Sequence, residues 1–318
     1  MGALSKKMGF IRRIICCFLA CAVGFPGYAA AAAGRFRVMG DGALTGTRGK
    51  GTATVRYRGA DGQYLAEGLR TINNFFGTSY DRPTERIELR LLELLDAVQD
   101  HFGGRAIVLR SGFRSPSENN GLRRQGKLAG QSSMHIEGGA VDFHLAGVAS
   151  AEVAAYARSL EVGGVGYYHG REVHLDTGPV RQWDEQTSGT ESREPQRNAK
   201  IILQTEYDHY RPGEPVRLRW MRITEFPVAV PLRVTLECDR DGRATSLGEV
   251  MLQYGEGVLH RKDGCAVLET RAAARSPVWV AAVGDRCGAR HRLRVRFCER
   301  PSEAMPAEVT SNIFQIDD

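Results

Sequence analysis

A polar run from Trp183 to Ala199 divides this chain into two parts with different hydrophobic patterns, and the division limits the folds open to it. Before the run, apolar side chains alternate between helical and strand spacing. After the run, only short strand patterns occur. We therefore expect two domains, at residues 34–184 and 200–318, joined by a linker over residues 185–199.

The first part combines helices and strands, which indicates an α+β fold with helices packed on a small antiparallel sheet. Leu65, Leu69, Ile72 and Phe76, for example, recur at helical spacing. The expected helices are Tyr64–Phe76, Ile87–Phe102 and Ala151–Leu160, the last capped by Ser150. The expected strands are Ala53–Tyr57, Ala106–Leu109, Ala140–Leu145, Val165–Tyr168 and Val173–Asp176.

The second part is predicted to be an all-β, sandwich-like accessory domain built from short antiparallel strands. Its expected strands are Val216–Trp220, Leu232–Leu236, Val278–Val283 and Leu293–Phe297. The pattern leaves two roles open: a binding or positioning module, or a simple packing partner for the first part.

All four cysteines outside the first 33 residues lie in the second part, and their even number favours two disulfides in an exported protein. Their spacing does not resemble a zinc ribbon. Four cysteines allow three pairings, of which we prefer Cys238–Cys265 and Cys287–Cys298, because Gly288–Arg290 can turn a hairpin between the last two.

Residues 1–33 are typical of an export signal, because basic residues up to Arg13 precede the apolar run Ile14–Phe25 and the small residues Ala29–Ala33. Twelve apolar residues span about 18 Å as a helix, which is too short for a bilayer core of about 30 Å. We expect no transmembrane span once the signal is removed, and a location in the periplasm or cell envelope. An uncleaved anchor, a twin-arginine signal at Arg12-Arg13 and a lipid attachment at Cys21 remain alternatives.

The positive charge of the chain is concentrated in that signal. It holds four of the 43 basic residues and none of the 37 acidic ones, so the rest of the chain carries a net charge of about +2. This balance argues against a nucleic-acid-binding surface. The sequence leaves the oligomeric state open.

Histidines and acidic residues gather on two of the expected strands. Side chains on a strand alternate between faces, so Asp142 and His144 share one face of their strand, and His174 shares a face with Glu172 and Asp176. His135 lies on a loop leading to the first of these strands. Two imidazoles and one carboxylate bind Zn²⁺ and leave a fourth position open for water, which is the pattern of a catalytic site.

The order of these residues resembles the M15 family of zinc peptidases, and within it an exported subgroup of murein endopeptidases, over about residues 52–184. The resemblance lies in four segments, namely Ser111–Pro116 with its Arg114, Ser133–Asp142, Gly163–Tyr168, and Val173–Pro179 followed by Arg181 and Trp183. It implies a zinc-dependent peptidase that acts on the stems or cross-links of peptidoglycan. It implies nothing about residues 200–318.

By this resemblance His135, Asp142 and His174 are the zinc ligands. Ser133 matches a serine that helps to hold the substrate backbone, and Arg114 matches an arginine that stabilises the oxyanion, which suits a guanidinium aimed at developing negative charge. Zinc lowers the pKa of its bound water and polarises the scissile carbonyl.

The general base stays open. Several branches of the family carry an acid three residues before the last histidine, but this chain has Arg171 there. Glu172 shares the ligand face and is slightly favoured. Asp176 shares the same face and is a second candidate, although it could orient His174 instead. His144 is a third candidate. Arg171 also leaves room for a second reading, a non-catalytic, zinc-containing protein that binds the cell wall.

Overall fold

The computed structural model describes residues 34–48, 51–127, 129–187, 195–240, 242–280 and 290–316, all of which belong to one compact unit. The predicted export signal, Cys287 and residues 188–194 of the predicted linker lie outside these residues. Within the described residues, no helix is both long and apolar enough to span a bilayer.

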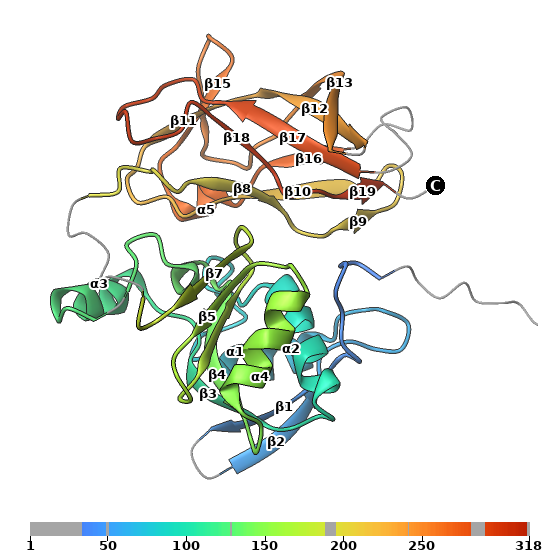
Figure 1. Ribbon diagram of the computed structural model, residues 1–318. Coiled ribbons are helices and arrows are strands. Elements are labelled where there is room, and N and C mark those ends of the chain that lie inside the picture. Colours follow the sequence, from blue (N-terminus) through green and yellow to red (C-terminus); the bar gives the residue numbers. More distant parts are fainter. Residues whose placement is uncertain are drawn as a thin grey trace, which may run out of the picture. The chain divides into compact units, whose positions relative to one another are not determined.

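A seven-stranded sheet forms the centre of the first part (Figure 1). Its strands run in the order β2-β1-β3-β4-β6-β5-β7. The β1–β3 and β5–β7 pairs are parallel, and the other pairs are antiparallel. The strands are β1 (Ala43–Arg48), β2 (Gly51–Arg56), β3 (Ile107–Ser111), β4 (Ala140–Leu145), β5 (Gly164–Tyr167), β6 (Val173–Asp176) and β7 (Arg181–Asp184).

The helices α1, α2 and α4 pack on this sheet because each carries an apolar stripe. Leu91, Leu95 and Val98 of α2 are fully buried, and α4 lies against β4, β5 and β6. The helices are α1 (Ala66–Phe75), α2 (Leu89–His101), α3 (Pro116–Arg124), α4 (Ser150–Ser159) and the 3₁₀ helix η1 (Met134–Glu137). The α+β prediction is confirmed. Ser150 is not the helix cap that we expected, because α4 begins one residue earlier, with Ala149 at the N-cap.

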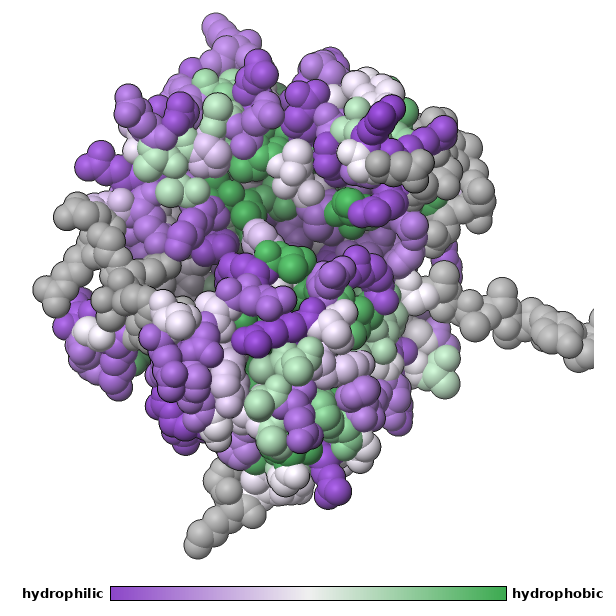
Figure 2. Space-filling view, viewed as in Figure 1, coloured by the Kyte–Doolittle hydropathy of each residue, from purple (hydrophilic) through white to green (hydrophobic). Residues whose placement is uncertain are grey.

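Short, mostly antiparallel strands make up the second part, and its sheets share one core. Val216 and Trp220 of β10, Leu236 of β12 and Leu293 of β17 meet there. The elements are β8 (Ile202–Thr205), β9 (His209–Tyr210), β10 (Pro215–Met221), β11 (Val228–Pro231), β12 (Arg233–Arg240), β13 (Arg243–Met251), β14 (Leu259–His260), β15 (Cys265–Leu268), α5 (Arg271–Ala274), β16 (Val278–Val280), β17 (Arg290–Arg296), β18 (Glu308–Thr310) and β19 (Gln315–Ile316). On the face in Figure 2, hydrophobic residues lie in small groups between hydrophilic ones.

A disulfide joins Cys265 to Cys298, with the two Cα atoms 6.4 Å apart. Our preferred pairing was therefore wrong. Cys265 begins β15, which belongs to a different sheet from β12 and its Cys238, whereas Cys298 follows β17. Cys238 is also disulfide-bonded. The disulfide links two sheets of the second part, a relation that hairpin reasoning from the sequence does not reveal.

The two parts meet around the carboxylate of Glu137, the last residue of η1. Glu137 is 2% exposed and pairs with Arg271 at 2.7 Å and Arg275 at 3.1 Å. It also accepts the backbone N–H of Arg222 at 3.0 Å. Burial alone would raise the pKa of Glu137, but the two guanidinium groups hold it below its usual range. The η1 segment is thus anchored to the second part through a buried, ionised carboxylate.

We expect Arg275→Met to lower the free energy of unfolding by about 2–3 kcal/mol, because it removes one of two guanidinium partners from a buried carboxylate. Arg296→Met is the matched control, since the Arg296–Glu308 pair is exposed and such pairs contribute less than about 1 kcal/mol. Urea unfolding with the disulfides intact measures both variants. Equal losses of unfolding free energy in the two variants would show that the buried ion pair contributes no more than the exposed one.

Candidate active site

Strand register brings the predicted metal ligands together. β4 and β6 pair so that Asp142 lies directly opposite His174, and Ser111 of β3 lies opposite Asp142 on the other side. His135 comes from η1, which ends at Gly138 with φ 74°. A side chain at Gly138 would place its Cβ 2.2 Å from the carbonyl oxygen of Arg86, so this turn into β4 requires glycine.

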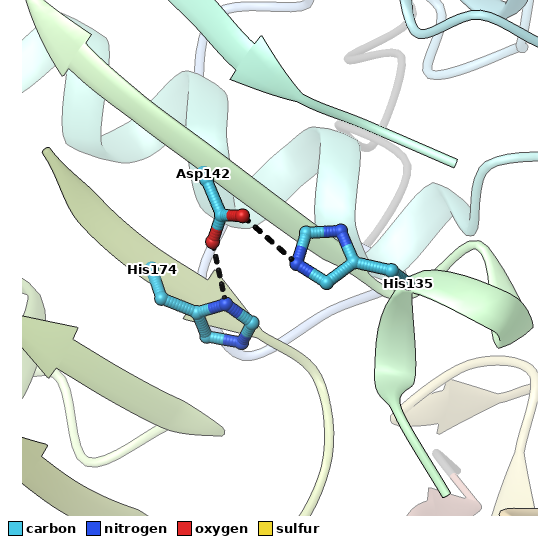
Figure 3. Close-up of side chains that lie close together, drawn as sticks. All are labelled: His135, Asp142 and His174. Atoms are coloured by element: carbon cyan, nitrogen blue, oxygen red, sulfur yellow. Dashed lines mark hydrogen bonds and ion pairs between the residues drawn. The ribbon is translucent and has the colours of Figure 1, made fainter. Parts of the chain in front are cut away.

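His135, Asp142 and His174 form one buried cluster (Figure 3). His174 Nδ1 lies 2.8 Å from Asp142 Oδ1, and His135 Nε2 lies 3.3 Å from Asp142 Oδ2. One ligand atom from each residue lies within 4.8 Å of the others. This separation and this set of nitrogen and carboxylate donors suit a single zinc ion.

Each imidazole is held by a second partner at its other nitrogen. His135 Nδ1 donates to the Gly112 carbonyl at 2.7 Å, and His174 Nε2 lies 2.9 Å from Asp176 Oδ2. Such outer contacts fix the ring and the nitrogen that faces a metal. They leave His135 Nε2 and His174 Nδ1 directed at Asp142.

Electrostatics around the cluster favours a cation. Burial lowers the pKa of His135, so its Nε2 presents a lone pair to the Asp142 carboxylate. Burial would also lower the pKa of His174, but Asp142 and Asp176 raise it to about 9. Desolvation opposes ionisation of Asp142, yet the two histidines hold its pKa well below its usual range. The His135 lone pair and the Asp142 carboxylate face each other at 3.3 Å, and a metal cation would attract both.

Arg114 and Ser133 lie beside the cluster. Arg114 donates through Nη2 to Asp142 Oδ2 at 2.6 Å and through Nε to Ser111 Oγ at 2.8 Å. Ser133 caps η1, and its Oγ accepts the backbone N–H of His135 at 3.3 Å. Both line the cleft described below, so the structure brings these two predicted residues to the candidate metal ligands.

The three candidate bases occupy different places. Asp176 is fully buried, and its carboxylate accepts hydrogen bonds from Arg181 and from the backbone N–H groups of Gly164 and Gly178. Its contact with His174 is at the ring nitrogen that does not face Asp142. This geometry is that of a residue that orients the imidazole.

Glu172 immediately precedes β6, and His144 lies on β4. Glu172 pairs with Arg110 at 3.1 Å, and its side chain is 20% exposed. Burial raises the pKa of Tyr168, a cleft residue, and the nearby Asp142 and Glu172 raise it further. His144 lines a different pocket, with its Nδ1 buried and without a hydrogen bond. Arg171 pairs with Glu185 at the surface.

A cleft of about 320 Å³ opens over the cluster. Among the lining residues to which sequence reasoning gave no role are Tyr168, Arg181, Trp183, Lys200 and Arg222. The Trp183 ring lies 4.9 Å from that of His174, and it packs on Gly166, where a Cβ would meet the indole at 2.4 Å. Arg181 and Trp183 stand in the segment that carries the family resemblance, so that segment could have revealed them. Lys200 and Arg222 carry no local signal.

Comparisons with known proteins relate the first part of the chain to peptidoglycan endopeptidases. An M15 peptidase family model, described as peptidoglycan L,D-endopeptidase MepK, matches residues 43–183. Peptidoglycan L,D-endopeptidase MepK of Escherichia coli K12 is 39% identical over 122 residues, covering 38% of this chain and 67% of that protein. Probable peptidoglycan L,D-endopeptidase MepK of Haemophilus influenzae is 41% identical over 101 residues, covering 31% of this chain and 54% of that protein.

We expect the wild-type protein to bind one zinc ion per chain, and His135→Ala and Asp142→Ala to lose stoichiometric zinc, because each removes one of three ligands. His144→Ala is the matched control: it removes an imidazole from the same strand as Asp142, but one that lines another pocket. Metal analysis after dialysis measures all three. Full zinc content in both ligand variants would contradict the assignment.

Proposed function

Because this chain belongs to the M15 peptidase family of MepK-type endopeptidases, we propose that it is a zinc-dependent metallopeptidase that hydrolyses peptide bonds in the stems or cross-links of peptidoglycan. The observation that carries the proposal is the buried His135–Asp142–His174 cluster at the base of a cleft. The relatives are named L,D-endopeptidases, and we extend that bond class to this chain. Its place of action is then the periplasm or cell envelope.

In this proposal His135 Nε2, Asp142 and His174 Nδ1 hold the zinc ion, which supplies an acidified water and polarises the scissile carbonyl. Gly112 and Asp176 keep the two imidazoles in the orientation that binding needs.

Arg114 is proposed to stabilise negative charge on the carbonyl oxygen of the scissile bond. Its guanidinium already lies within 2.6 Å of a ligand oxygen, and it is held in place by Ser111. A fixed cation at this position acts without reorganisation during the reaction. Ser133, which precedes η1 and lines the cleft, is proposed to hold the substrate backbone. Trp183 and Tyr168 line the same cleft with their aromatic rings.

Glu172 is our candidate for the general base, and Asp176 for the residue that orients His174. The carboxylate of Asp176 is already occupied by Arg181, His174 and two backbone N–H groups, which leaves it poorly placed to accept a proton from water. Glu172 shares the ligand face of β6 and is partly exposed. Its ion pair with Arg110 would have to break during turnover so that the carboxylate can accept a proton.

A second function rests on that ion pair and on Arg171. If Glu172 stays engaged by Arg110, and Arg171 occupies the position where related branches carry an acid, the site would keep zinc without turnover. The chain would then bind the cell wall without cutting it. In either function we propose residues 200–318 as an accessory domain that follows a linker at 185–199.

Digestion of isolated sacculi tests the proposed function. We expect the zinc-loaded protein to release shorter muropeptides from the sacculi. A chelator should abolish this release, because it removes the zinc ion that would activate the attacking water. Product masses would identify the bond class. Binding to sacculi with no new muropeptide would favour the non-catalytic function instead.

The carboxylates of Glu172 and Asp176 should respond differently to neutralisation. We expect Glu172→Gln to keep zinc and to lose turnover by about 10²–10⁴-fold, as for a general base. We expect Asp176→Asn to lose zinc affinity by about 10–100-fold and to regain part of its activity with added zinc, as for a residue that orients a ligand.

Zinc titration and muropeptide release, measured on the same preparations, separate the two roles. The opposite pattern would transfer the base to Asp176. Full activity in both variants would make His144 the leading candidate.

A further inference from the structure

The 3₁₀ helix η1, which carries His135, is in contact with cations of the second part. Glu137 ends η1, and its carboxylate accepts from Arg271 Nη1 at 2.7 Å and from Arg275 Nη2 at 3.1 Å. Arg275 Nη2 also donates to the backbone carbonyl of Glu137 at 3.0 Å. Both cations lie beyond residue 183, where the match to the family model ends. The surroundings of a candidate metal ligand thus include residues outside the matched segment.

Both cations are carried by a packed element of the second part. Arg271 begins α5 and Arg275 is its C-cap, so their spacing places the two side chains on the same side of one helical turn. Ala274 of α5 is 2% exposed and belongs to the core of the second part. The two guanidinium groups therefore reach Glu137 from an element that is itself anchored.

Two further contacts join the second part to segments that carry the candidate ligands. Met221 of β10 packs in one buried cluster with Met134 of η1 and Ala140 of β4. Gln204 of β8 donates through Nε2 to the carbonyl of Thr177, the residue after β6, at 2.7 Å. Strands β4 and β6 are already paired on both sides within their own sheet. The segment whose position the second part can affect most is therefore η1.

We propose that Arg271 and Arg275 are positioning residues for the metal site, which set its zinc affinity by holding η1 through Glu137. The proposal rests on the zinc site of the function proposed above. A single turn of helix is unstable by itself, so η1 without these contacts samples several arrangements. His135 then faces Asp142 only part of the time, and the apparent dissociation constant for zinc rises in inverse proportion to that fraction.

A matched pair of arginine variants tests this role. The side chains of Arg271 and Arg292 are each 28% exposed, and each pairs with a buried glutamate that has a second arginine partner. The partner of Arg271 is Glu137 of η1, whereas the partner of Arg292 is Glu237 of β12. Arg271→Met and Arg292→Met should therefore lose similar amounts of unfolding free energy, but only the first should disturb η1.

Competition with a chelator of known zinc affinity measures the dissociation constant of each variant. We expect Arg271→Met to weaken zinc binding by about tenfold, the lower end of the range for residues that orient metal ligands. Arg292→Met should bind zinc as the wild type does. Arg271→Lys should retain most of the affinity, because Arg271 reaches Glu137 through one nitrogen, a contact that an ammonium can make. Wild-type affinity in Arg271→Met, or an equal loss in Arg292→Met, would overturn the proposal.

A second pair of variants and a measurement without zinc support the same comparison. Glu137→Gln should weaken zinc binding and Glu237→Gln should not, which keeps the test decisive if Arg271→Met does not fold. Hydrogen exchange of the zinc-free proteins, measured by mass spectrometry on peptides spanning residues 133–139, should be faster in Arg271→Met and Glu137→Gln than in the wild type and Arg292→Met. Unchanged exchange in this segment would contradict the positioning role.

Zinc binding and hydrogen exchange are measured without turnover, so this proposal and the peptidase function fail separately. If no preparation releases muropeptides, but Arg271→Met binds zinc more weakly than the wild type and Arg292→Met do, the peptidase function fails and the positioning role stands. If the wild type digests sacculi and both arginine variants bind zinc as it does, the positioning role fails alone.

Discussion

The contact between Asp142 and His174 across β4 and β6 is the constraint on which the rest of the site depends. It exists because the register of this antiparallel pair places the two residues directly opposite each other. A shift of either strand by one residue would turn its own ligand toward the apolar core. The buried neighbours Val141, Phe143 and Val173 resist that shift, so the packing of the sheet protects the geometry of the cluster.

His135 depends on a different kind of support, since it comes from a short 3₁₀ helix. One end of η1 is capped by Ser133, the other turns at Gly138, and the carboxylate of Glu137 is held by Arg271 and Arg275. A single turn of helix has little stability of its own. The second part of the chain therefore supports one of the three candidate ligands from behind.

Much of the peptidase part could be predicted from sequence because its signals are local. Strands 140–145 and 173–176 follow from apolar runs, and alternation alone placed Asp142 and His174 on polar faces. The disulfide and the two cations of the cleft wall were missed for one physical reason. Cys265–Cys298 spans 33 residues between different sheets, and Arg222 reaches Ser132 across 90 residues. Contacts of that range leave no periodic pattern in the sequence.

The same reasoning separates what the two parts do. In the first part, chemistry needs donors at fixed distances, so they lie on paired strands or are anchored to buried partners. The second part acts on that geometry through a buried ion pair, because Arg271 and Arg275 hold the carboxylate of Glu137 at the end of η1. Asp142 and His174 are thus placed by strand pairing within the first part, whereas the placement of His135 also depends on cations of the second part.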